Sequence, residues 1–313
     1  MNKGGFEFGF VWIFAIIIGA VIIFLAIFAV TSIISTERLT QDTETGKQIG
    51  ILLNPIETNL EEAKTAKITF AKETRIYNGC ESFGTFGKQK ISVASKSDIG
   101  NSWEDLGIPS SFNNKYLFSE NITEGKNVIV LSKHFEMPFK VANLVYMWSS
   151  EDSYCFVDPP SEIKKEIGDL NQKTLVINDS VGDCPSESKK VCFNSLCDIS
   201  VYFLVSHLKG EVEKTDSSGN PVHYEGLPLL YGAIFSDPGI YGCQVERLLK
   251  RTAELSDIYL NKTSYLEKKG CSSNLGLVLE QLSVTAGDNK LVDAAAHAKE
   301  LDVRNGLLKC KLF

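Results

Sequence analysis

The sequence predicts an α+β protein that one N-terminal helix anchors in a membrane, and three observations lead to this prediction. The first is a run of 27 residues, from Phe8 to Ile34, that contains no charged side chain. The second is a series of short β-branched and aromatic runs after Lys67, separated by Gly, Asn, Pro and Ser, which is typical of strands and turns. The third is the spacing of three and four residues between apolar side chains in the last third of the chain, which indicates helices.

The uncharged run is long enough to cross a membrane as a helix. At about 1.5 Å per residue it would extend over about 40 Å, whereas the hydrocarbon core of a bilayer is about 30 Å thick. Signal sequences that are removed have an apolar core of only about 7 to 15 residues, so we expect residues 8–34 to remain as a transmembrane helix in contact with lipid. Ala15 and Gly19 stand four residues apart, and small residues at this spacing can let two membrane helices pair, which allows a homo-oligomer. Small residues are also common in membrane helices that do not pair.

The charges beside this helix predict its orientation. Lys3 precedes the helix, whereas the segment after it is acidic on balance through Glu37, Asp42 and Glu44. Because basic residues tend to remain on the cytoplasmic side, we expect residues 1–7 to form a short cytoplasmic tail and the rest of the chain to be extracytoplasmic.

All the cysteines follow the predicted membrane helix, and none lies within it. An even number of cysteines on the outer side is typical of disulfide bonds in an oxidising compartment. Cysteine usage therefore supports the extracytoplasmic location independently of the charges. The eight residues are Cys80, Cys155, Cys184, Cys192, Cys197, Cys243, Cys271 and Cys310.

The chain after the membrane helix divides into three predicted parts. Residues 35–66 continue the helix outward as a stalk, because helix-forming residues persist there. Pro55 lies inside this pattern, and we expect it to kink the stalk or divide it into two helices, since proline removes a backbone hydrogen bond. Residues 67–236 are predicted to form a disulfide-stapled β-rich domain with a mixed or antiparallel sheet, and residues 237–313 a helical part packed on it.

Strands within the β-rich part are predicted from local patterns and turn residues. One hairpin is expected to join residues 115–118 to 127–131 around Glu124-Gly125, and another to join 210–214 to 221–225. The other expected elements are strands at 154–157, 174–177 and 199–205 and a short helix at 160–170.

Three helices are predicted in the last part, where they would form a cap on the sheet. The first begins at Asp237-Pro238, an N-cap acceptor followed by proline, and extends to about Tyr265. The other two are expected over residues 273–285 and 288–304.

The length of the first of these helices limits the disulfide pairing. It would be about 40 Å long, so Cys243 near its start and Cys271 beyond its end cannot reach the Cα separation of about 5.5 Å that a disulfide needs. Two further helices would bring Cys310 back beside Cys271. We therefore favour a Cys271–Cys310 disulfide, with Cys243 bonded to a cysteine of the sheet, and leave the other pairings open.

No catalytic motif is recognisable in the sequence. It contains no G-x-S-x-G elbow, no H-E-x-x-H zinc helix and no G-x-x-x-x-G-K-[ST] phosphate loop, so we expect neither an enzyme nor a cofactor. The net charge of −7 argues against nucleic acid as a partner, because its recognition calls for basic patches. The alternative is a hydrolase, whose site would combine His207 and His223 with Glu211 or Glu225.

One segment offers oxygen ligands for a metal ion. Asp179, Ser180 and Asp183 follow an apolar strand, and oxygen ligands of this kind can hold a divalent cation. The same residue types are typical of a turn that side chains stabilise, and we favour that interpretation.

The first residues of the chain carry a family resemblance. Lys3-Gly4-Gly5-Phe6-Glu7, followed by a long apolar helix, resembles the N-terminus of type IV pilin-like proteins, in which a dedicated peptidase cuts after a glycine and the exposed helix packs into a filament core. This resemblance implies cleavage between Gly5 and Phe6 and a role as a minor filament subunit. Glu7 departs from the pattern, because it would stand second after the cut instead of fifth. The chain as a whole is similar to uncharacterised single-span surface proteins of archaea, a similarity that implies no activity.

These observations predict a non-enzymatic, single-pass surface protein whose extracytoplasmic domain binds a protein or glycan of the cell envelope or forms part of its structure. Two alternatives remain open, a pilin-like minor filament subunit processed after Gly5 and a membrane-anchored extracytoplasmic hydrolase. N-terminal processing and the position of the histidines distinguish them.

Overall fold

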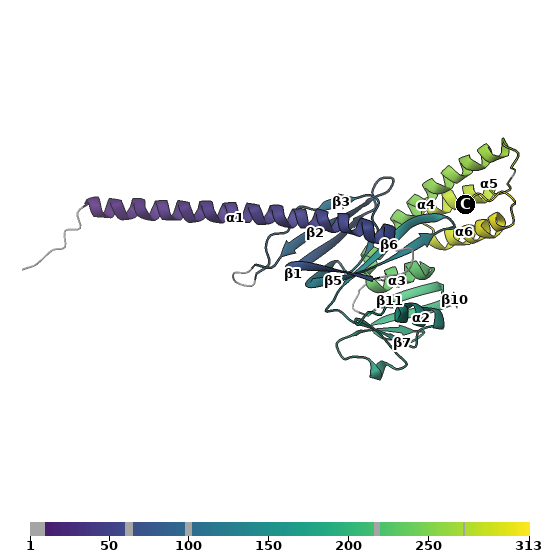
Figure 1. Cartoon of the computed structure of the whole chain (residues 1–313), viewed down its shortest axis with the longest axis horizontal. Coiled ribbons are helices and arrows are strands. Elements are labelled where there is room, and N and C mark those ends of the chain that lie inside the picture. Colours follow the sequence, from purple (N-terminus) through teal and green to yellow (C-terminus); the bar gives the residue numbers. More distant parts are fainter. Residues whose placement is uncertain (1–9, 60–64, 98–101, 216–219, 272) are drawn as a thin grey trace, which may run out of the picture.

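The computed structural model describes residues 10–59, 65–97, 102–215, 220–271 and 273–313. Helix α1 (Phe10–Asn59) forms a single rod whose first half projects from the folded part of the chain (Figure 1). Its segment Trp12–Val30 has a mean hydropathy of 3.3, and none of it is buried. Within the described residues this is the one helix that is long and apolar enough to cross a membrane, in agreement with the predicted anchor.

The second half of α1 packs against the folded domain, so the segment predicted as a stalk does not stand free. Ile49 and Leu53 are buried against the first sheet, and the helix continues through Pro55 to Asn59. The prediction that Pro55 divides the helix is therefore wrong. Packing of the turns just before the proline offsets the one backbone hydrogen bond that proline removes.

The first sheet has six strands in the order β3-β2-β1-β5-β6-β4. Neighbouring strands are antiparallel, except that β4 and β6 are parallel. The strands are β1 (Thr65–Glu81), β2 (Lys88–Ser95), β3 (Ser110–Phe112), β4 (Leu117–Phe118), β5 (Ile122–Glu136) and β6 (Lys140–Ser149).

Both faces of this sheet are covered. Val128 and Val130 of β5 belong to the core beneath α1, whereas Ile129 and Leu131 between and after them belong to a larger core on the opposite face. This alternation follows from the two-residue period of a strand. The sheet is therefore the middle layer of the molecule.

One of the two predicted hairpins is wrong, because β4 pairs with β6 while β5 lies between β1 and β6. Glu124-Gly125, which was expected to form a turn, lies inside β5. Gly125 has a φ of 152°, and a Cβ added to it would stand 2.8 Å from Ser149 Oγ of β6. Glycine is therefore present for the close approach of two strands, and not for a turn.

The second sheet also has six strands, in the order β12-β11-β10-β9-β7-β8. Strands β8, β7, β9 and β10 are parallel, and β11 is antiparallel to both β10 and β12. Helix α2 (Ser161–Asp169) connects β7 to β8, and a short 3₁₀ turn (Val181–Asp183) follows β8. The strands are β7 (Tyr154–Val157), β8 (Leu175–Asn178), β9 (Lys189–Phe193), β10 (Ile199–Ser206), β11 (Lys209–Lys214) and β12 (Val222–Glu225).

The local predictions for this part are confirmed. The three expected strands correspond to β7, β8 and β10, the short helix to α2, and the second hairpin to the antiparallel pair β11 and β12. Their ends differ from the predicted ones by a residue or two, which is the usual uncertainty of element boundaries. Strand β9 was not predicted.

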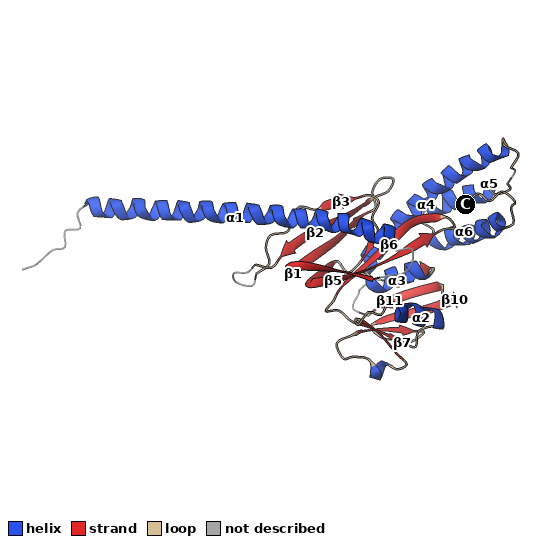
Figure 2. Cartoon of the chain, viewed as in Figure 1, coloured by secondary structure: helices blue, strands red, loops and turns tan. Residues whose placement is uncertain are grey.

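Helix α3 (Leu227–Phe235) lies between the two sheets (Figure 2) and was not predicted. Eight of its nine residues are buried, and a segment that is apolar on all sides has no amphipathic period by which to recognise a helix. The ring of Phe235 packs 4.8 Å from that of Trp148 on β6 and 4.9 Å from that of Tyr154 on β7, measured between centroids. This helix therefore joins both sheets into one core.

Three longer helices complete the chain close to their predicted ranges. The first of these helices contacts β1, β4 and β6 of the first sheet. The middle helix packs on the first helix, and the last helix packs on the middle helix (Figure 2). The first and the last of these helices therefore each contact a sheet, the last one at β12 of the second sheet. The three helices are α4 (Pro238–Glu267), α5 (Gly276–Gly287) and α6 (Leu291–Gly306).

Candidate functional site

The uncovered half of α1 is the first feature with a functional meaning. Ala15 and Gly19, the predicted pairing residues, lie one turn apart on this half, and Ala15 is exposed. No atom from elsewhere lies within 4 Å of the position that a Cβ on Gly19 would take. The surface around them is therefore open to lipid or to another helix. Gly5 and Phe6, the predicted processing site, lie outside the described residues.

Polar contacts join α1 to the sheet where the helix enters the domain. The carboxylate of Asp42, which is 3% exposed, accepts hydrogen bonds from Ser95 Oγ (2.5 Å) and Ser95 N (3.1 Å). One residue further on, Thr43 Oγ1 accepts a hydrogen bond from Ile108 N (3.0 Å). A buried carboxylate is stabilised only when such donors face it. The domain is therefore attached to α1 at a defined height along the helix.

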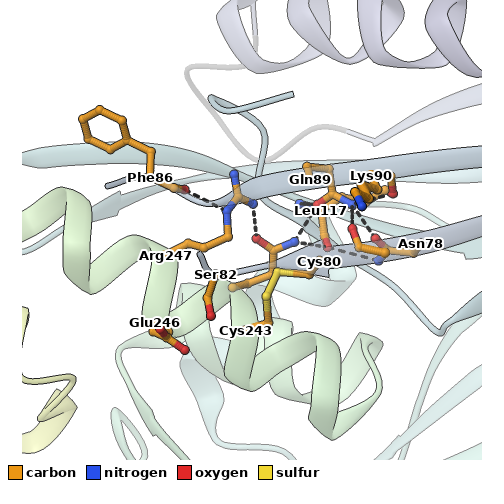
Figure 3. The surroundings of a disulfide bond; sticks show 12 residues. Asn78, Cys80, Ser82, Phe86, Gln89, Lys90, Leu117, Cys243, Glu246 and Arg247 are labelled. Atoms are coloured by element: carbon orange, nitrogen blue, oxygen red, sulfur yellow. Dashed lines mark hydrogen bonds between the residues drawn. A yellow bond between two sulfur atoms is a disulfide. The ribbon is translucent and has the colours of Figure 1, made fainter. Parts of the chain in front are cut away.

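The Cys80–Cys243 disulfide fastens the end of strand β1 in the same sheet to α4. It joins β1 to the second turn of the helix, with a Cα separation of 6.1 Å (Figure 3). The next residue, Gln244, donates from Nε2 to Gln89 Oε1 (2.5 Å) and to Leu117 O (3.1 Å). The disulfide therefore lies beside a buried hydrogen-bond network.

Arg247 completes this network one turn further along α4 (Figure 3). Its guanidinium is fully buried and donates to the backbone carbonyls of Phe86 (3.0 Å), Lys115 (2.8 Å) and Asn113 (3.1 Å). It also lies over the Tyr116 ring, 4.7 Å from the centroid. Burial lowers the pKa of Arg247 to about 10, so the group remains charged at neutral pH. Its role is to tie three loop carbonyls to the helix.

All eight cysteines are paired in the structure. Cys271 is bonded to Cys310, the pair that the sequence favoured, and Cys243 is bonded to a cysteine of the sheet, as the helix length required. The sequence did not resolve the remaining pairs, Cys155–Cys184 and Cys192–Cys197. The Cα separations of the four bonds, from 5.8 to 6.2 Å, lie in the range of about 4.4 to 6.8 Å that disulfides adopt.

A cluster of charged side chains lies where the two sheets meet the start of α4. Glu120 is 3.0 Å from Lys189 Nζ and 3.8 Å from Lys214 Nζ. Asp237 occupies the N-cap position of α4, but its side chain does not cap the helix. Its Oδ2 instead accepts a hydrogen bond from Asn121 N (2.5 Å). The sequence identified the helix start correctly and the side-chain partner wrongly, because that partner lies 116 residues away.

The two carboxylates of this cluster have opposite pKa shifts. Burial, and then the charge of Glu120, raises the pKa of Asp237. Burial also disfavours the charged form of Glu120, but Lys214 and Lys189 outweigh it and lower the pKa of that group. The lysines thus balance the charge of Glu120, and the cluster is explained as an internal ion network.

The residues of the predicted cation site adopt a turn. Asp179 is exposed and lies 3.4 Å from Lys164 Nζ, and Ser180 Oγ accepts a hydrogen bond from Gly182 N (3.2 Å). Asp183 follows within the 3₁₀ turn. Within the part of the chain that the structure describes, no three His, Cys, Asp or Glu side chains are grouped so that they could hold a metal ion.

The two histidines of the predicted hydrolase site have different partners. His223 Nδ1 lies 3.3 Å from Glu211 Oε1, as the sequence suggested, whereas His207 Nε2 lies 2.6 Å from Glu162 Oε2 of α2, which sequence analysis missed. Glu225 pairs instead with Lys209 at 2.8 Å. No contact in the described residues joins the two histidines to one carboxylate.

No family model matches the chain, and neither the curated proteins nor the solved structures include a match.

Proposed function

We propose that the protein is a non-enzymatic, single-pass surface protein that binds a partner in the cell envelope or forms part of its structure. The division of α1 carries this proposal: Trp12–Val30 is apolar and uncovered, whereas Ile49 and Leu53 are buried in the domain. An uncovered apolar helix of this length calls for lipid or other helices around it. The four disulfides support a location of the domain in an oxidising compartment.

One continuous helix joins the apolar span to the domain, which supports a role in organised contacts. α1 has no break between Val30 and Asp42, so Asp42, which is buried against the domain, lies about 18 Å from the end of the apolar span, at about 1.5 Å per residue. A flexible linker would let the domain turn freely. A continuous helix instead gives the domain a defined orientation relative to its anchor.

Thiol labelling of intact cells tests the predicted orientation. The native chain has no free cysteine, so a membrane-impermeant maleimide should not react with it unless a reductant is added. Lys299→Cys places a thiol on the exposed surface of α6, and we expect it to react without reductant. Ala298→Cys is the matched control, because that neighbouring position is only 5% exposed. Reaction of Lys299→Cys only after the cells are opened would contradict the extracytoplasmic location.

A pilin-like minor filament subunit is the second candidate, and the form of α1 favours it. The first half of this helix provides an open apolar surface with the small residues Ala15 and Gly19. The second half of the same helix attaches the domain. Packing of such helices side by side would bury their apolar surfaces and place the domains around a common core. The resemblance of the first residues to pilin-like proteins points to the same role.

Intact-mass measurement of the native protein distinguishes the two candidates. A chain that begins at Phe6 supports the filament subunit. A chain that retains Met1 to Gly5 contradicts it and leaves the surface-protein proposal in place. Cross-linking gives a second test, because Gly19→Leu should reduce helix pairing, whereas Ile16→Leu, which places the same side chain on the same span without adding volume, should not.

A further inference from the structure

A cavity on the extracytoplasmic domain has the features of a binding site that neither proposed function uses. It has a volume of about 330 Å³, within the range of pockets that hold small ligands, about 300 to 1,000 Å³. Its walls come from the loop before β4, the start of β6 and the middle of α4. The lining residues are Asn114, Lys140, Val141, Ala142, Asn143 and Arg251.

The lining of this cavity is cationic in a protein whose net charge is −7. Lys140 and Arg251 both line it, and among the lining residues that the structure describes there is no carboxylate. Glu136 stands opposite Lys140 in the strand register, and Glu254 lies one turn after Arg251 on α4. Neither of these described carboxylates forms an ion pair with Lys140 or Arg251. Across the described ranges of the chain, Lys140 and Arg251 have no ion-pair partner.

A comparison of two arginines on α4 indicates that Arg251 does not serve to hold neighbouring segments of the chain together. Arg247 donates to three backbone carbonyls and to Gln244 Oε1, so each of its three nitrogens has a hydrogen-bond partner. Arg251, one turn later, has a buried Nε without a hydrogen-bond partner. An arginine that fastens a loop would be expected to have the contacts of Arg247. Arg251 instead holds a partly desolvated charge beside an open cavity, which favours the arrival of an anion.

The walls of the cavity are held in place without a ligand. Arg247 Nη2 donates to the carbonyl of Asn113 (3.1 Å), next to Asn114 of the lining. In the part of the lining that β6 provides, Asn143 Oδ1 lies 2.5 Å from His134 Nδ1 on the neighbouring strand. A preformed wall reduces the ordering cost of binding.

We propose that this cavity binds the oxyanion group of a small ligand, a carboxylate or a phosphate, on a molecule of about the size of one sugar unit. The planar guanidinium of Arg251 matches either group through paired N–H donors, and the ammonium of Lys140 adds a second charge. Asn114 supplies an amide for neutral hydroxyl groups of the ligand. The proposal does not depend on whether the chain is an anchored surface protein or a filament subunit.

Isothermal titration of the full chain in detergent micelles tests this proposal with three probes. Inorganic phosphate and D-glucuronate represent the two sources of an oxyanion, and D-glucose is the neutral control. We expect saturable binding of at least one anionic probe, weakening as sodium chloride is raised, and no binding of glucose. Phosphate alone would identify a phosphate ligand, and glucuronate alone a carboxylate on a sugar.

Variants connect the binding to the cavity. Arg251→Gln and Lys140→Gln should each weaken it at least tenfold, Arg251→Lys should weaken it less, and Lys299→Gln on the exposed surface of α6 should leave it unchanged. Lys140→Gln alone decides the matter if Arg251→Gln does not fold, as judged by its thermal unfolding. Absence of saturable binding with both anionic probes would overturn the proposal, and so would binding that a folded Lys140→Gln variant retains at full strength.

Discussion

Gly50 of α1 lies directly against the ring of Phe112 on β3, so that a Cβ added to Gly50 would stand 2.0 Å from Phe112 Cζ. A glycine inside a helix ordinarily lowers helix stability. Here it lets the second half of α1 approach the sheet closely enough for Ile49 and Leu53 to be buried. The fit between these two residues is therefore part of the attachment of the anchor to the domain.

This fit predicts the effect of a single added methyl group. Gly50→Ala should lower the free energy of unfolding of the domain by about 1–3 kcal/mol, because the Phe112 ring must turn away from α1 and lose its packing. Gly19→Ala is the matched control on the same helix, since open space surrounds that position. Chemical denaturation in micelles measures both.

A compensating change tests the cause. Phe112→Leu shortens the side chain that a Cβ at position 50 would meet. It should therefore recover part of the stability lost in Gly50→Ala when the two substitutions are combined. Simple additivity of the two losses would mean that this contact is not the cause.

The buried guanidinium of Arg247 predicts a large loss on removal. Arg247→Met should lower the free energy of unfolding by roughly 3 kcal/mol, because each buried acceptor left without a donor costs about 1–3 kcal/mol. Arg251→Met, one turn later on α4, removes no hydrogen bond from the described structure and should cost only about 0.5 kcal/mol. Urea denaturation of the two variants measures the difference. Equal losses would contradict the role assigned to Arg247.

The disulfides should differ in how much each contributes to the free energy of unfolding, according to the length of chain that each one closes. Cys80–Cys243 spans 163 residues and Cys192–Cys197 spans 5. Chain entropy predicts a loss of about 5 kcal/mol for the double serine variant of the first and about 2 kcal/mol for that of the second. Thermal unfolding of the two double variants compares them. A greater loss from the short loop would show that local packing, and not chain entropy, dominates.

Buried tyrosines predict a loss of stability in alkaline solution. Burial, and then the charge of Glu166, raises the pKa of Tyr146 and Tyr231 well above 10, and burial with the neighbouring Tyr224 does the same for Tyr241. The folded state thus retains protons that the unfolded state releases. The contribution of these tyrosines to the free energy of unfolding is therefore complete below pH 10 and decreases as the pH rises above 10.

Denaturation between pH 8 and pH 11 measures this decrease, with tyrosinate absorbance as the second readout. Tyr146→Phe removes one of the titrating groups, together with its hydrogen bond to Pro228 O (2.7 Å). It should therefore make the decrease less steep, although it lowers the stability at neutral pH. An unchanged slope would exclude Tyr146 as a contributor.

Local signals accounted for the elements that were predicted correctly. The β11–β12 hairpin and the helix α2 depend on residues within a short stretch of chain, and so does the start of α4 at Asp237-Pro238. The glycine signal at Gly125 failed because it served the contact between β5 and Ser149, which is not local. Helix α3 was missed because burial on every side removed its periodicity.

The functional groups also divide into those that local signals indicate and those that only contacts between distant segments bring together. Glu162 as the partner of His207 and the cavity around Lys140 and Arg251 could not be predicted, because their parts come from separate elements. The Cys271–Cys310 pair was within reach, because the length of α4 limits which cysteines can meet. Among contacts between distant segments, this pair could be worked out before the fold was known because a single helix limits it.

The sequence by itself determined that the chain has one apolar helix at its start and that its cysteines all follow it, since hydropathy and cysteine count need no partner. Only the tertiary structure decided that the second half of α1 is covered by β2 and β3 while the first half is not. An apolar helical surface shows that something must cover it. What covers it depends on β2 and β3, which follow the helix residues Ile49 and Leu53 by 35 to 63 residues (88 − 53 and 112 − 49) and are brought there by the fold as a whole.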